Sequence, residues 1–418
     1  MKLAIVGTGI SGLGAAWRLH GRHDVRVFER EGRAGGHSHT VAVPDGGREV
    51  SVDTGFLVYN EVTYPNLVKL FTKLGVPTKE SDMSFSVRCE KCDVEWCGTG
   101  LSGVFAQPAN LLRPSFHGML LEIARFNREA PRLLEEPGAE SLTLAAYLDR
   151  ERYGRAFRSH YLIPMAASVW SSGPAAMETF PAATLVRFFR NHGFLGVTTQ
   201  FRWRTVDGGS REYVKLLTEP FRDRIHLGNG VAKVRRDGHG VELVFADGGS
   251  QRFDGVLIAT HADEALAMLE EPTADERRLL GAWTFSRNET LLHSDRSFLP
   301  RRRGARASWN YHLDDCTRPW GSATLHYWIN RLQGLPTETD WIVSLNPRRE
   351  PAEGTVARRL LYTHPVYTPA SVATQAELAT LNGKGRTWFA GAWFGYGFHE
   401  DGLRSGLEAA VSLGAEPL

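Results

Sequence analysis

The chain has 418 residues, a formal net charge of +2, and 42% hydrophobic against 23% charged residues. This composition is typical of a soluble globular protein long enough for two domains, and the near-neutral charge excludes a general affinity for nucleic acid. No apolar run reaches the roughly 18–20 residues that a membrane span requires. Because the first predicted strand begins at residue 3, we expect no signal peptide and a cytoplasmic protein.

The first predicted elements form a dinucleotide-binding unit. Residues 3–6 predict a buried strand, the run Gly-Thr-Gly-Ile-Ser-Gly at 7–12 a tight turn, and residues 13–19 a helix. Gly7 permits the turn, Gly9 lets the backbone approach a pyrophosphate, and Gly12 lets the helix pack against the strand. The N–H groups and the positive end of the helix dipole then attract phosphate.

A carboxylate follows the second predicted strand. Residues 25–28 are apolar and end at Glu29, seventeen positions after Gly12. At that place the carboxylate can accept the ribose hydroxyls of a dinucleotide, and it repels a 2′-phosphate, which disfavours NADP. The alternative is an ordinary glycine-rich loop, but strand, turn, helix and acid in register favour a bound dinucleotide.

Residues 76–204 have a different character and are predicted to be mainly helical. Within them, residues 111–127 are apolar with arginines nearby, which suits either a packed helix or a helix on a membrane surface. Large apolar residues either fill the core or line a long substrate tunnel; these are Leu162, Ile163, Met165, Trp170, Phe188, Phe189 and Phe194.

Three of the four cysteines are clustered, at Cys89, Cys92 and Cys97. The pair at 89 and 92 has the spacing of a zinc knuckle. A structural zinc site needs four ligands, however, and Cys316 is distant with no second paired motif in the chain. We therefore predict no metal, and interpret the segment as a turn between two strands with reduced thiols.

The remaining segments return twice to the nucleotide-binding fold. Short β-like runs between 225 and 259, separated by Asn-Gly, Asp-Gly and Asp-Gly-Gly turns, predict a β-meander and a buried strand. Residues 387–390 predict a last strand, followed by a glycine-rich loop and a helix from about Gly402. The predicted fold is α/β: a Rossmann-like domain of residues 1–75, 205–265 and 381–418, with an inserted α+β substrate domain of residues 76–204 and 266–380.

Several segments beyond the first motif resemble one family. Glu29, Arg30 and the glycine pair 35–36, then the runs at 53–56, 229–231 and 390–410, resemble the FAD-dependent amine oxidase and phytoene desaturase superfamily. The resemblance implies FAD as the cofactor, with its flavin reaching the C-terminal helix. The cofactor contacts that it implies are Gly7, Gly9, Ser11, Gly12, Glu29, Arg30, Gly35, Gly36, His37, Gly55, Phe56, Val231, Gly391, Ala392, Gly402, Leu403 and Ser405.

Two positions depart from the family pattern. The family usually has Gly-Gly-Arg where this chain has His37, and amine oxidases usually have an acid where this chain has Ala392. The runs at 35–40 and 395–402 are similar to a bacterial branch of the superfamily in which some members resemble desaturases of fatty acyl chains. That resemblance implies a lipid-like substrate.

The predicted chemistry centres on the loop before the last helix. The alignment puts Phe398 at an aromatic-cage position of the amine oxidases, and no lysine matches the one that holds a water near the flavin in that family. Desaturation needs a base as well as a hydride acceptor, so we predict His399 as the base, with Glu400 or Asp401 orienting it. The alternative is a solvated loop without a catalytic role.

The leading hypothesis is an FAD-dependent oxidoreductase that removes a hydride from an apolar substrate, a fatty acyl or isoprenoid chain. The alternatives are a flavin-containing amine oxidase, a non-redox FAD-dependent isomerase or mutase, and an NAD-binding protein without flavin. Expected partners are a small-molecule or lipid-like substrate and, for a helix on a membrane surface, the inner membrane face. The sequence leaves the electron acceptor and the oligomeric state open.

Overall fold

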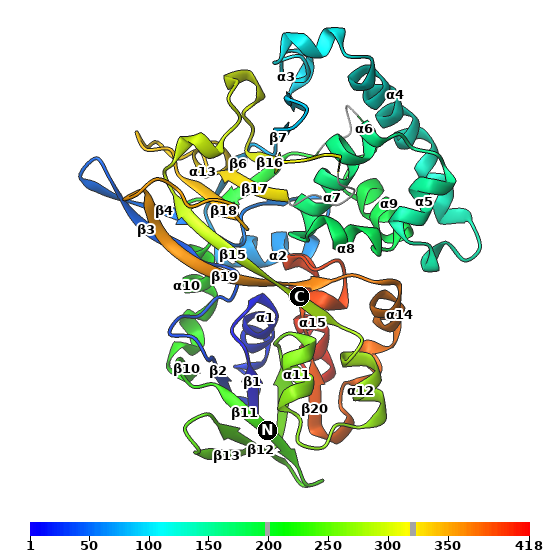
Figure 1. The fold of residues 1–418 in the computed structure, drawn as a ribbon. Helices are drawn as coiled ribbons and strands as arrows, with labels where there is room; N and C mark the ends of the chain where they lie inside the picture. Colours follow the sequence, from blue (N-terminus) through cyan, green and yellow to red (C-terminus); the bar gives the residue numbers. More distant parts are fainter. Residues whose placement is uncertain (197–200, 318–322) are drawn as a thin grey trace.

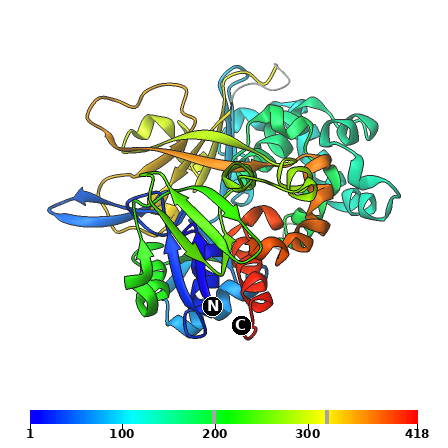
Figure 2. The same ribbon diagram turned by 90° about the horizontal axis from the view of Figure 1, so that it is seen from below.

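The computed structural model describes residues 1–196, 201–317 and 323–418. Two sheets organise the molecule: a parallel sheet in the lower half of Figure 1 and a larger mixed sheet above it. A helical lobe lies beside the mixed sheet, and the hairpin of β3 (Thr40–Asp45) and β4 (Arg48–Asp53) projects on the opposite side in both views (Figures 1 and 2). The predicted α/β fold is thereby confirmed.

The parallel sheet takes its strands from distant parts of the chain, in the order β10-β2-β1-β14-β20. Its central strands are almost wholly buried, which explains their continuous apolar runs. Alternate residues face opposite layers: Leu3 and Ile5 join one core cluster, and Ala4 and Val6 another. The strands are β1 (Lys2–Val6), β2 (Asp24–Phe28), β10 (Ile225–His226), β14 (Gly255–Ile258) and β20 (Thr387–Phe389).

Different layers cover the two faces of this sheet. On one face pack the helices α1 (Ile10–Leu19), α2 (Pro65–Leu74), α10 (Arg211–Thr218) and α15 (His399–Ser412). On the other face lies the predicted antiparallel meander, with α11 (Ala262–Met268) and α12 (Ala274–Leu280) beside it. The meander consists of β11 (Val231–Arg236), β12 (Val241–Phe245) and β13 (Ser250–Phe253).

The mixed sheet has the order β19-β15-β18-β17-β16-β7-β8. Its two longest strands, β15 and β19, pair along their length and run across the molecule between the two halves (Figure 1). The strands are β7 (Phe85–Cys89), β8 (Val94–Cys97), β15 (Thr284–His293), β16 (Trp309–Leu313), β17 (Ala323–Trp328), β18 (Ile342–Leu345) and β19 (Val356–Val366).

Residues 76–204 are mainly helical, as predicted, but they also contribute strands to two sheets. The hairpin β7–β8 joins the edge of the mixed sheet because β7 pairs in parallel with β16. A small sheet of the order β5-β9-β6 combines β5 (Tyr59–Asn60), β6 (Thr78–Ser81) and β9 (Trp203–Val206). The hairpin confirms the predicted turn between two strands around Cys89 and Cys92. Its pairing with β16 and the small sheet depend on partners distant in sequence, which local pattern could not reveal.

The remaining helices form the lobe and the connections between sheets. The lobe holds α3 (Gly100–Val104), α4 (Pro114–Glu129), α5 (Leu144–Arg150), α6 (Arg155–Phe157), α7 (Ile163–Trp170), α8 (Pro174–Glu178) and α9 (Ala182–Asn191), and the connections hold α13 (Ile329–Leu332) and α14 (Pro369–Leu378). Leu162, Ile163, Trp170, Phe188 and Phe189 are buried in the core, and Met165 and Phe194 pack against it. Five of these seven residues therefore belong to the buried core, and the other two line its margin.

Candidate active site

The candidate site lies at the carboxyl edge of the parallel sheet. There β1 leads into Gly7, β2 into Glu29, β14 into the Thr260–His261 turn, and β20 into Gly391. Parallel strands end at one edge, and open α/β sheets bind ligands in the crevice outside that edge. The four segments therefore meet in one place although the sequence separates them widely.

The glycine loop 7–12 is built to admit a ligand beside the backbone. Gly7 has a left-handed φ of +102°, and a side chain there would meet the carbonyl oxygen of Ala259. A Cβ on Gly12 would overlap the carbonyl oxygen of Gly7, whereas a Cβ on Gly9 would meet no atom within 4 Å. No side chain caps α1 and no acid lies in its first turn, so its N–H groups stay available for a phosphate.

Glu29 lies beside the segment that contains Val231. Its carboxylate accepts hydrogen bonds from the backbone N–H of Thr8 at 3.0 Å and of Glu31 at 2.9 Å, and from the Thr8 hydroxyl. The backbone N–H of Asn229 donates to the Glu29 carbonyl at 2.8 Å, which brings the start of β11 next to this turn. Glu29 and Val231 thus share the end of the edge expected for the adenosine portion of a dinucleotide.

Of the two arginines in this turn, Arg33 is the one that faces inward. The exposed side chain of Arg30, predicted as a cofactor contact, pairs with Glu264 at 3.2 Å. Arg33 is half-buried, and its guanidinium donates to the carbonyl oxygen of Gly36 at 2.8 Å. The sequence motif contains both residues, and only the fold distinguishes them.

The turn at 35–37 is held between the glycine loop and the segment 53–56. Gly35 donates its N–H to the carbonyl of Thr8 at 3.0 Å, and a Cβ on Gly36 would stand 3.0 Å from Cα of Gly9. Phe56 donates its N–H to the carbonyl of His37 at 2.8 Å, and a Cβ on Gly55 would overlap that carbonyl oxygen. The predicted glycines therefore shape the site through backbone approach.

Asp53 anchors this segment from behind. Its buried carboxylate accepts hydrogen bonds from Thr40, from the backbone and side chain of Ser210, and from Gln333. Burial raises the pKa of Asp53 to about 6. The residue joins the hairpin β3–β4 to α10 and to α13 of the mixed-sheet half.

A group of imidazoles that the sequence did not predict faces the same turn. The His37 ring lies 6.5 Å from that of His261, 5.3 Å from that of His364 and 5.1 Å from that of Tyr362. Buried Nε2 of His37 has no hydrogen-bond partner. Burial lowers the pKa of His37 to about 4, that of His364 well below 6.5, and that of His261 below 6.5, so these imidazoles are neutral at pH 7.

The unpartnered Nε2 of His37 can donate or accept a hydrogen bond with a bound ligand. Together with the open space at Gly9 and the uncapped start of α1, it fits a phosphate-bearing cofactor along the edge. His261 follows three positions after the end of the strand 255–258, at the edge where such sheets bind ligands, and this position could have identified it from the sequence. His364 on β19 carries no comparable local signal.

The last helix begins three residues earlier than expected, at His399. The carboxylate of Asp401 accepts a hydrogen bond from the backbone N–H of Phe398 at 3.1 Å, which fixes the start of α15. The free N–H groups of the first turn therefore belong to His399 and Glu400, while Gly402 already donates to the carbonyl of Phe398.

This shift corrects the role expected of Gly402, Leu403 and Ser405. A Cβ on Gly402 would stand 3.0 Å from Oγ of Ser11, and Leu403 is fully buried beside Gly14 of α1. Ser405 accepts a hydrogen bond from the N–H of Gly391 at 2.9 Å. These residues lock α15 against α1 and β20. Ala392 stands between them and the edge, with its Cβ 3.7 Å from a Cβ built on Gly402.

His399 is oriented by hydroxyl groups. Its Nε2 lies 2.9 Å from Oγ of Ser38 and 3.1 Å from the hydroxyl of Tyr213, and its ring stacks on Phe56 with centroids 3.7 Å apart. Burial lowers the pKa of His399 to about 3. The imidazole is therefore neutral at pH 7.

Glu400 has a different function from the predicted one. Its carboxylate accepts hydrogen bonds from the backbone N–H of Asn66 at 3.0 Å, from that of Leu67 at 3.0 Å and from the Asn66 amide at 2.7 Å. Glu400 thus caps α2, and Asp401 pairs with Arg404 at 2.9 Å. The prediction that one of these acids orients His399 is wrong.

Aromatic rings surround Phe398 on the side of the helical lobe. Its ring stacks on Phe188 with centroids 5.0 Å apart and lies 6.3 Å from the rings of Trp170 and His192. The indole N–H of Trp170 donates to the carbonyl of Tyr396 at 3.0 Å. The loop before α15 is therefore seated on the lobe.

A family model described as flavin containing amine oxidoreductase matches residues 10–306. No curated protein matches the sequence.

Among solved structures, cyclohexylamine oxidase from Brevibacterium oxydans IH-35A has a TM-score of 0.70 at 18% identity, covering 99% of this chain and 98% of that one. A fatty acid isomerase from P. acnes that produces CLA has a TM-score of 0.68 at 13% identity and 99% coverage of both chains. Putrescine oxidase bound to putrescine has a TM-score of 0.69 at 13% identity, covering 99% of this chain and 98% of that one. At these identities the structures share the fold.

Proposed function

The chain belongs to the family of flavin-containing amine oxidoreductases with FAD as its cofactor, and within this family we propose that it oxidises an apolar substrate, a fatty acyl or isoprenoid chain. FAD when bound supplies the hydride acceptor, N5 of its flavin ring. The chain's own residues position the substrate, exclude water and accept the accompanying proton.

The observation that carries this proposal is that, among the described residues, the buried carboxylates that could pair with an ammonium group already have partners. The buried carboxylates of the segments around the site are already engaged: Asp53 with Ser210, Glu400 with the start of α2, and Asp401 with Arg404. All eight lysines lie in the described part of the chain, and none is buried. The imidazoles that face the 35–37 turn, His37, His261 and His364, are neutral at pH 7 and offer an ammonium group no negative charge.

The ring of Phe398 supports the same conclusion. Amine recognition by an aromatic cage needs open ring faces that attract the cation. Phe398 is stacked on Phe188 and half-buried among other apolar rings. An apolar chain gains free energy against such a surface simply by leaving water.

His399 remains our predicted proton acceptor, although burial lowers its pKa to about 3 and so makes it a weaker base than an ordinary histidine. For this role its Nε2 must donate to Ser38 or Tyr213, which leaves the lone pair on Nδ1 for the substrate proton. We expect His399→Ala to keep its flavin and to reduce flavin by substrate about 10²–10⁴-fold more slowly. Reduction of the His399 variant at the wild-type rate would remove this residue from the mechanism.

The neighbouring folds leave two alternatives. Amine oxidases share this fold, as does a fatty acid isomerase that rearranges its substrate. An amine oxidase would release hydrogen peroxide with an amine, and an isomerase would convert its substrate without an external electron acceptor.

The test is anaerobic mixing of the yellow holoprotein with acyl phospholipids and, separately, with cyclohexylamine and putrescine. We expect the visible flavin absorption to bleach with the acyl lipids and to persist with both amines. Bleaching by an amine alone, or double-bond migration in the lipid without bleaching, contradicts the proposal.

We also propose a peripheral contact between α4 and a lipid surface. Leu121 on α4 is 73% exposed, Leu112 in the short turn Pro108–Leu112 before it is 87% exposed, and exposed Leu101 and Leu111 lie on the same stretch. No helix within the described residues is long and apolar enough to cross a bilayer. We expect sedimentation with phospholipid vesicles that Leu112→Ser with Leu121→Ser abolishes; Val411→Ser, also at an exposed apolar position, is the control. Equal sedimentation of the wild type and the Leu112→Ser with Leu121→Ser variant contradicts the contact.

A further inference from the structure

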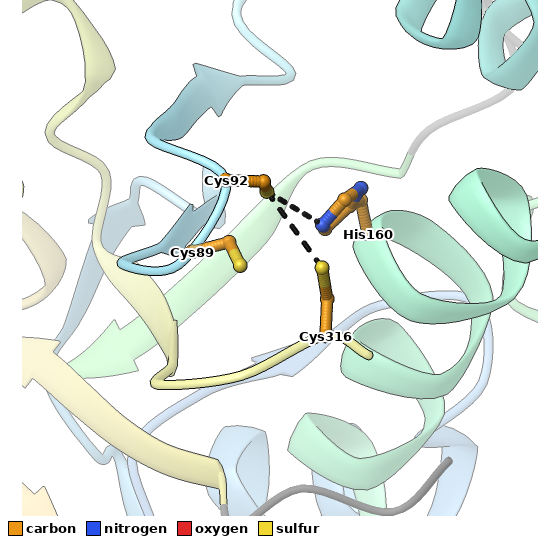
Figure 3. A group of neighbouring side chains, drawn as sticks. All are labelled: Cys89, Cys92, His160 and Cys316. Carbon is orange, nitrogen blue, oxygen red and sulfur yellow. Dashed lines mark hydrogen bonds between the residues drawn. The ribbon is translucent and has the colours of Figure 1, made fainter. Parts of the chain in front are cut away.

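Four side chains from three distant segments converge away from the flavin edge. Cys89 ends β7 and Cys92 lies in the turn to β8, His160 lies in the π-helical turn η4 (Arg158–Leu162), and Cys316 follows β16. Their ligand atoms all lie within 4.8 Å of one another. Figure 3 shows the three thiols and the imidazole directed toward one point.

The separations match a tetrahedral metal site. Zn–S bonds of about 2.3 Å and a Zn–N bond of about 2.0 Å set sulfur atoms about 3.8 Å apart and sulfur about 3.5 Å from nitrogen. Sγ of Cys92 lies 3.7 Å from Sγ of Cys316 and 3.4 Å from Nε2 of His160. A disulfide would require the sulfurs to approach to about 2.05 Å, and all four cysteines are free thiols.

The donor set also selects the metal and its role. Three thiols and one imidazole are soft ligands, which favour zinc over the oxygen-seeking Mg²⁺ or Ca²⁺. Cys89 and Cys316 are only 1% and 8% exposed, so a metal held by all four groups is closed to substrate. Closed Cys₃His sites are structural.

The backbone around the cluster is arranged to hold the ligands. Glu90 donates its N–H to the carbonyl of Leu313 at 2.8 Å, which ties the cysteine turn to the segment before Cys316. The indole N–H of Trp96 donates to the carbonyl of His160 at 3.1 Å, and the guanidinium of Arg155 donates to the carbonyl of Cys316 at 3.1 Å. Such outer contacts orient metal ligands.

Two local distortions bring the ligands into place. The π-helical turn at η4 interrupts the run of α6 and α7 at His160, and such turns often mark functional positions. Asp93, directly after Cys92, has a left-handed φ of 46°, which reverses the chain beside the thiol.

We propose that Cys89, Cys92, His160 and Cys316 bind one structural zinc ion. The ion joins the hairpin β7–β8, the segment after β16 and the helical lobe, which otherwise meet through side-chain packing and a few hydrogen bonds. The objection drawn from the sequence, that the pair 89–92 lacks two further ligands, is met by His160 and Cys316. The proposal does not depend on which substrate the flavin oxidises.

The first experiment measures metal content in the full-length holoprotein, purified without chelator and dialysed. We expect about one zinc per chain by mass spectrometry of the elements, released when a mercurial blocks the thiols. Cys316→Ser and His160→Ala should each lose most of the zinc. Cys97→Ser is the matched control, because buried Cys97 lies on β8 outside the cluster and contacts Thr99 at 3.3 Å.

A second measurement needs no variant. Wild-type protein grown with cobalt should show the red-region absorption of tetrahedral cobalt thiolate, where oxidised flavin does not absorb. A wild-type chain that takes up neither zinc nor cobalt, a disulfide among these cysteines in the denatured protein, or equal zinc loss in Cys97→Ser and Cys316→Ser would overturn the proposal.

Discussion

The flavin edge and the cysteine cluster both assemble residues from distant parts of the chain, but they do so by different means. At the flavin edge, backbone atoms make the close contacts: Gly12 against Gly7 and Gly55 against His37. At the cluster, side-chain donors converge across 224 positions between Cys92 and Cys316. At the first region a side chain on Gly12 or Gly55 would therefore collide with the backbone, and at the second the loss of one donor would break the cluster.

The largest expected effect is that of a single methyl group added to the glycine loop. Gly12→Ala would drive Cβ into the carbonyl oxygen of Gly7, and we expect a loss of about 3 kcal/mol in the free energy of unfolding. Gly9→Ala meets no protein atom, so stability without flavin should change by less than about 0.5 kcal/mol.

The two variants differ again in flavin binding. Gly9→Ala should fold normally yet bind FAD about tenfold more weakly, a cost of about 1.4 kcal/mol, because its methyl group occupies space reserved for phosphate. Urea unfolding and flavin titration measure the two quantities. Equal destabilisation by both alanines would mean that Gly9 does not face ligand space.

Removing metal should affect the other region alone. We expect a strong chelator to lower the melting temperature of the wild type by about 5 °C or more, because zinc binds only the folded chain. Bound flavin per chain should stay the same. The chelator should not change the melting temperature of Cys316→Ser, and it should lower that of Cys97→Ser as much as that of the wild type. Loss of flavin without a change in melting temperature would contradict a structural zinc site at the cysteine cluster.

The same difference decides what the sequence could predict. The strand, turn, helix and acid of residues 3–29 follow one another within the first 29 residues, so the spacing of the glycines predicted them correctly. Gly12, for example, packs against the backbone of Gly7 only five positions away. The meander was predicted from its turn residues for the same reason. By contrast, the hairpin β7–β8 joins the mixed sheet because β7 pairs with β16, more than 200 positions away, and neither segment reveals this partner.

Side-chain roles at the site were harder to predict still. The adjacency of His399, Glu400 and Asp401 suggested that an acid orients the imidazole, but consecutive residues on a helix point in different directions. Glu400 turns toward α2, and His399 meets Ser38 and Tyr213, which are distant in sequence. The imidazole of His364 reaches His37 only because β19 crosses the edge, whereas that of His261 comes from the turn after β14.

A variant of Glu400 tests whether this residue caps α2 or takes part in catalysis. Glu400→Gln should cost about 2 kcal/mol in the free energy of unfolding, because a charged acceptor of three hydrogen bonds at the start of α2 becomes a neutral amide. The rate of flavin reduction by substrate should be unchanged once flavin is saturating. A slower rate with unchanged stability would return Glu400 to the catalytic role.

The smallest expected effect concerns the acid side of the stability profile. The folded pKa of His399 is lowered to about 3, so below about pH 6.5 the unfolded chain takes up a proton that the folded chain refuses. The contribution of His399 to stability is therefore lost as the pH falls from about 6.5 toward 3. His37 and His39, each with a pKa of about 4, act in the same direction.

Asp53 and Asp401 oppose this loss, because burial raises the pKa of each to about 6 and the folded chain then takes up protons first. A single profile would mix these contributions, but a difference between two proteins isolates one. Because His399→Gln keeps a polar group near Ser38 and removes the titration, the wild type should lose about 1 kcal/mol more than the variant for each pH unit between pH 6 and pH 4.5. Urea unfolding at saturating FAD measures both slopes, and parallel slopes would mean that His399 is exposed to protons in the folded protein.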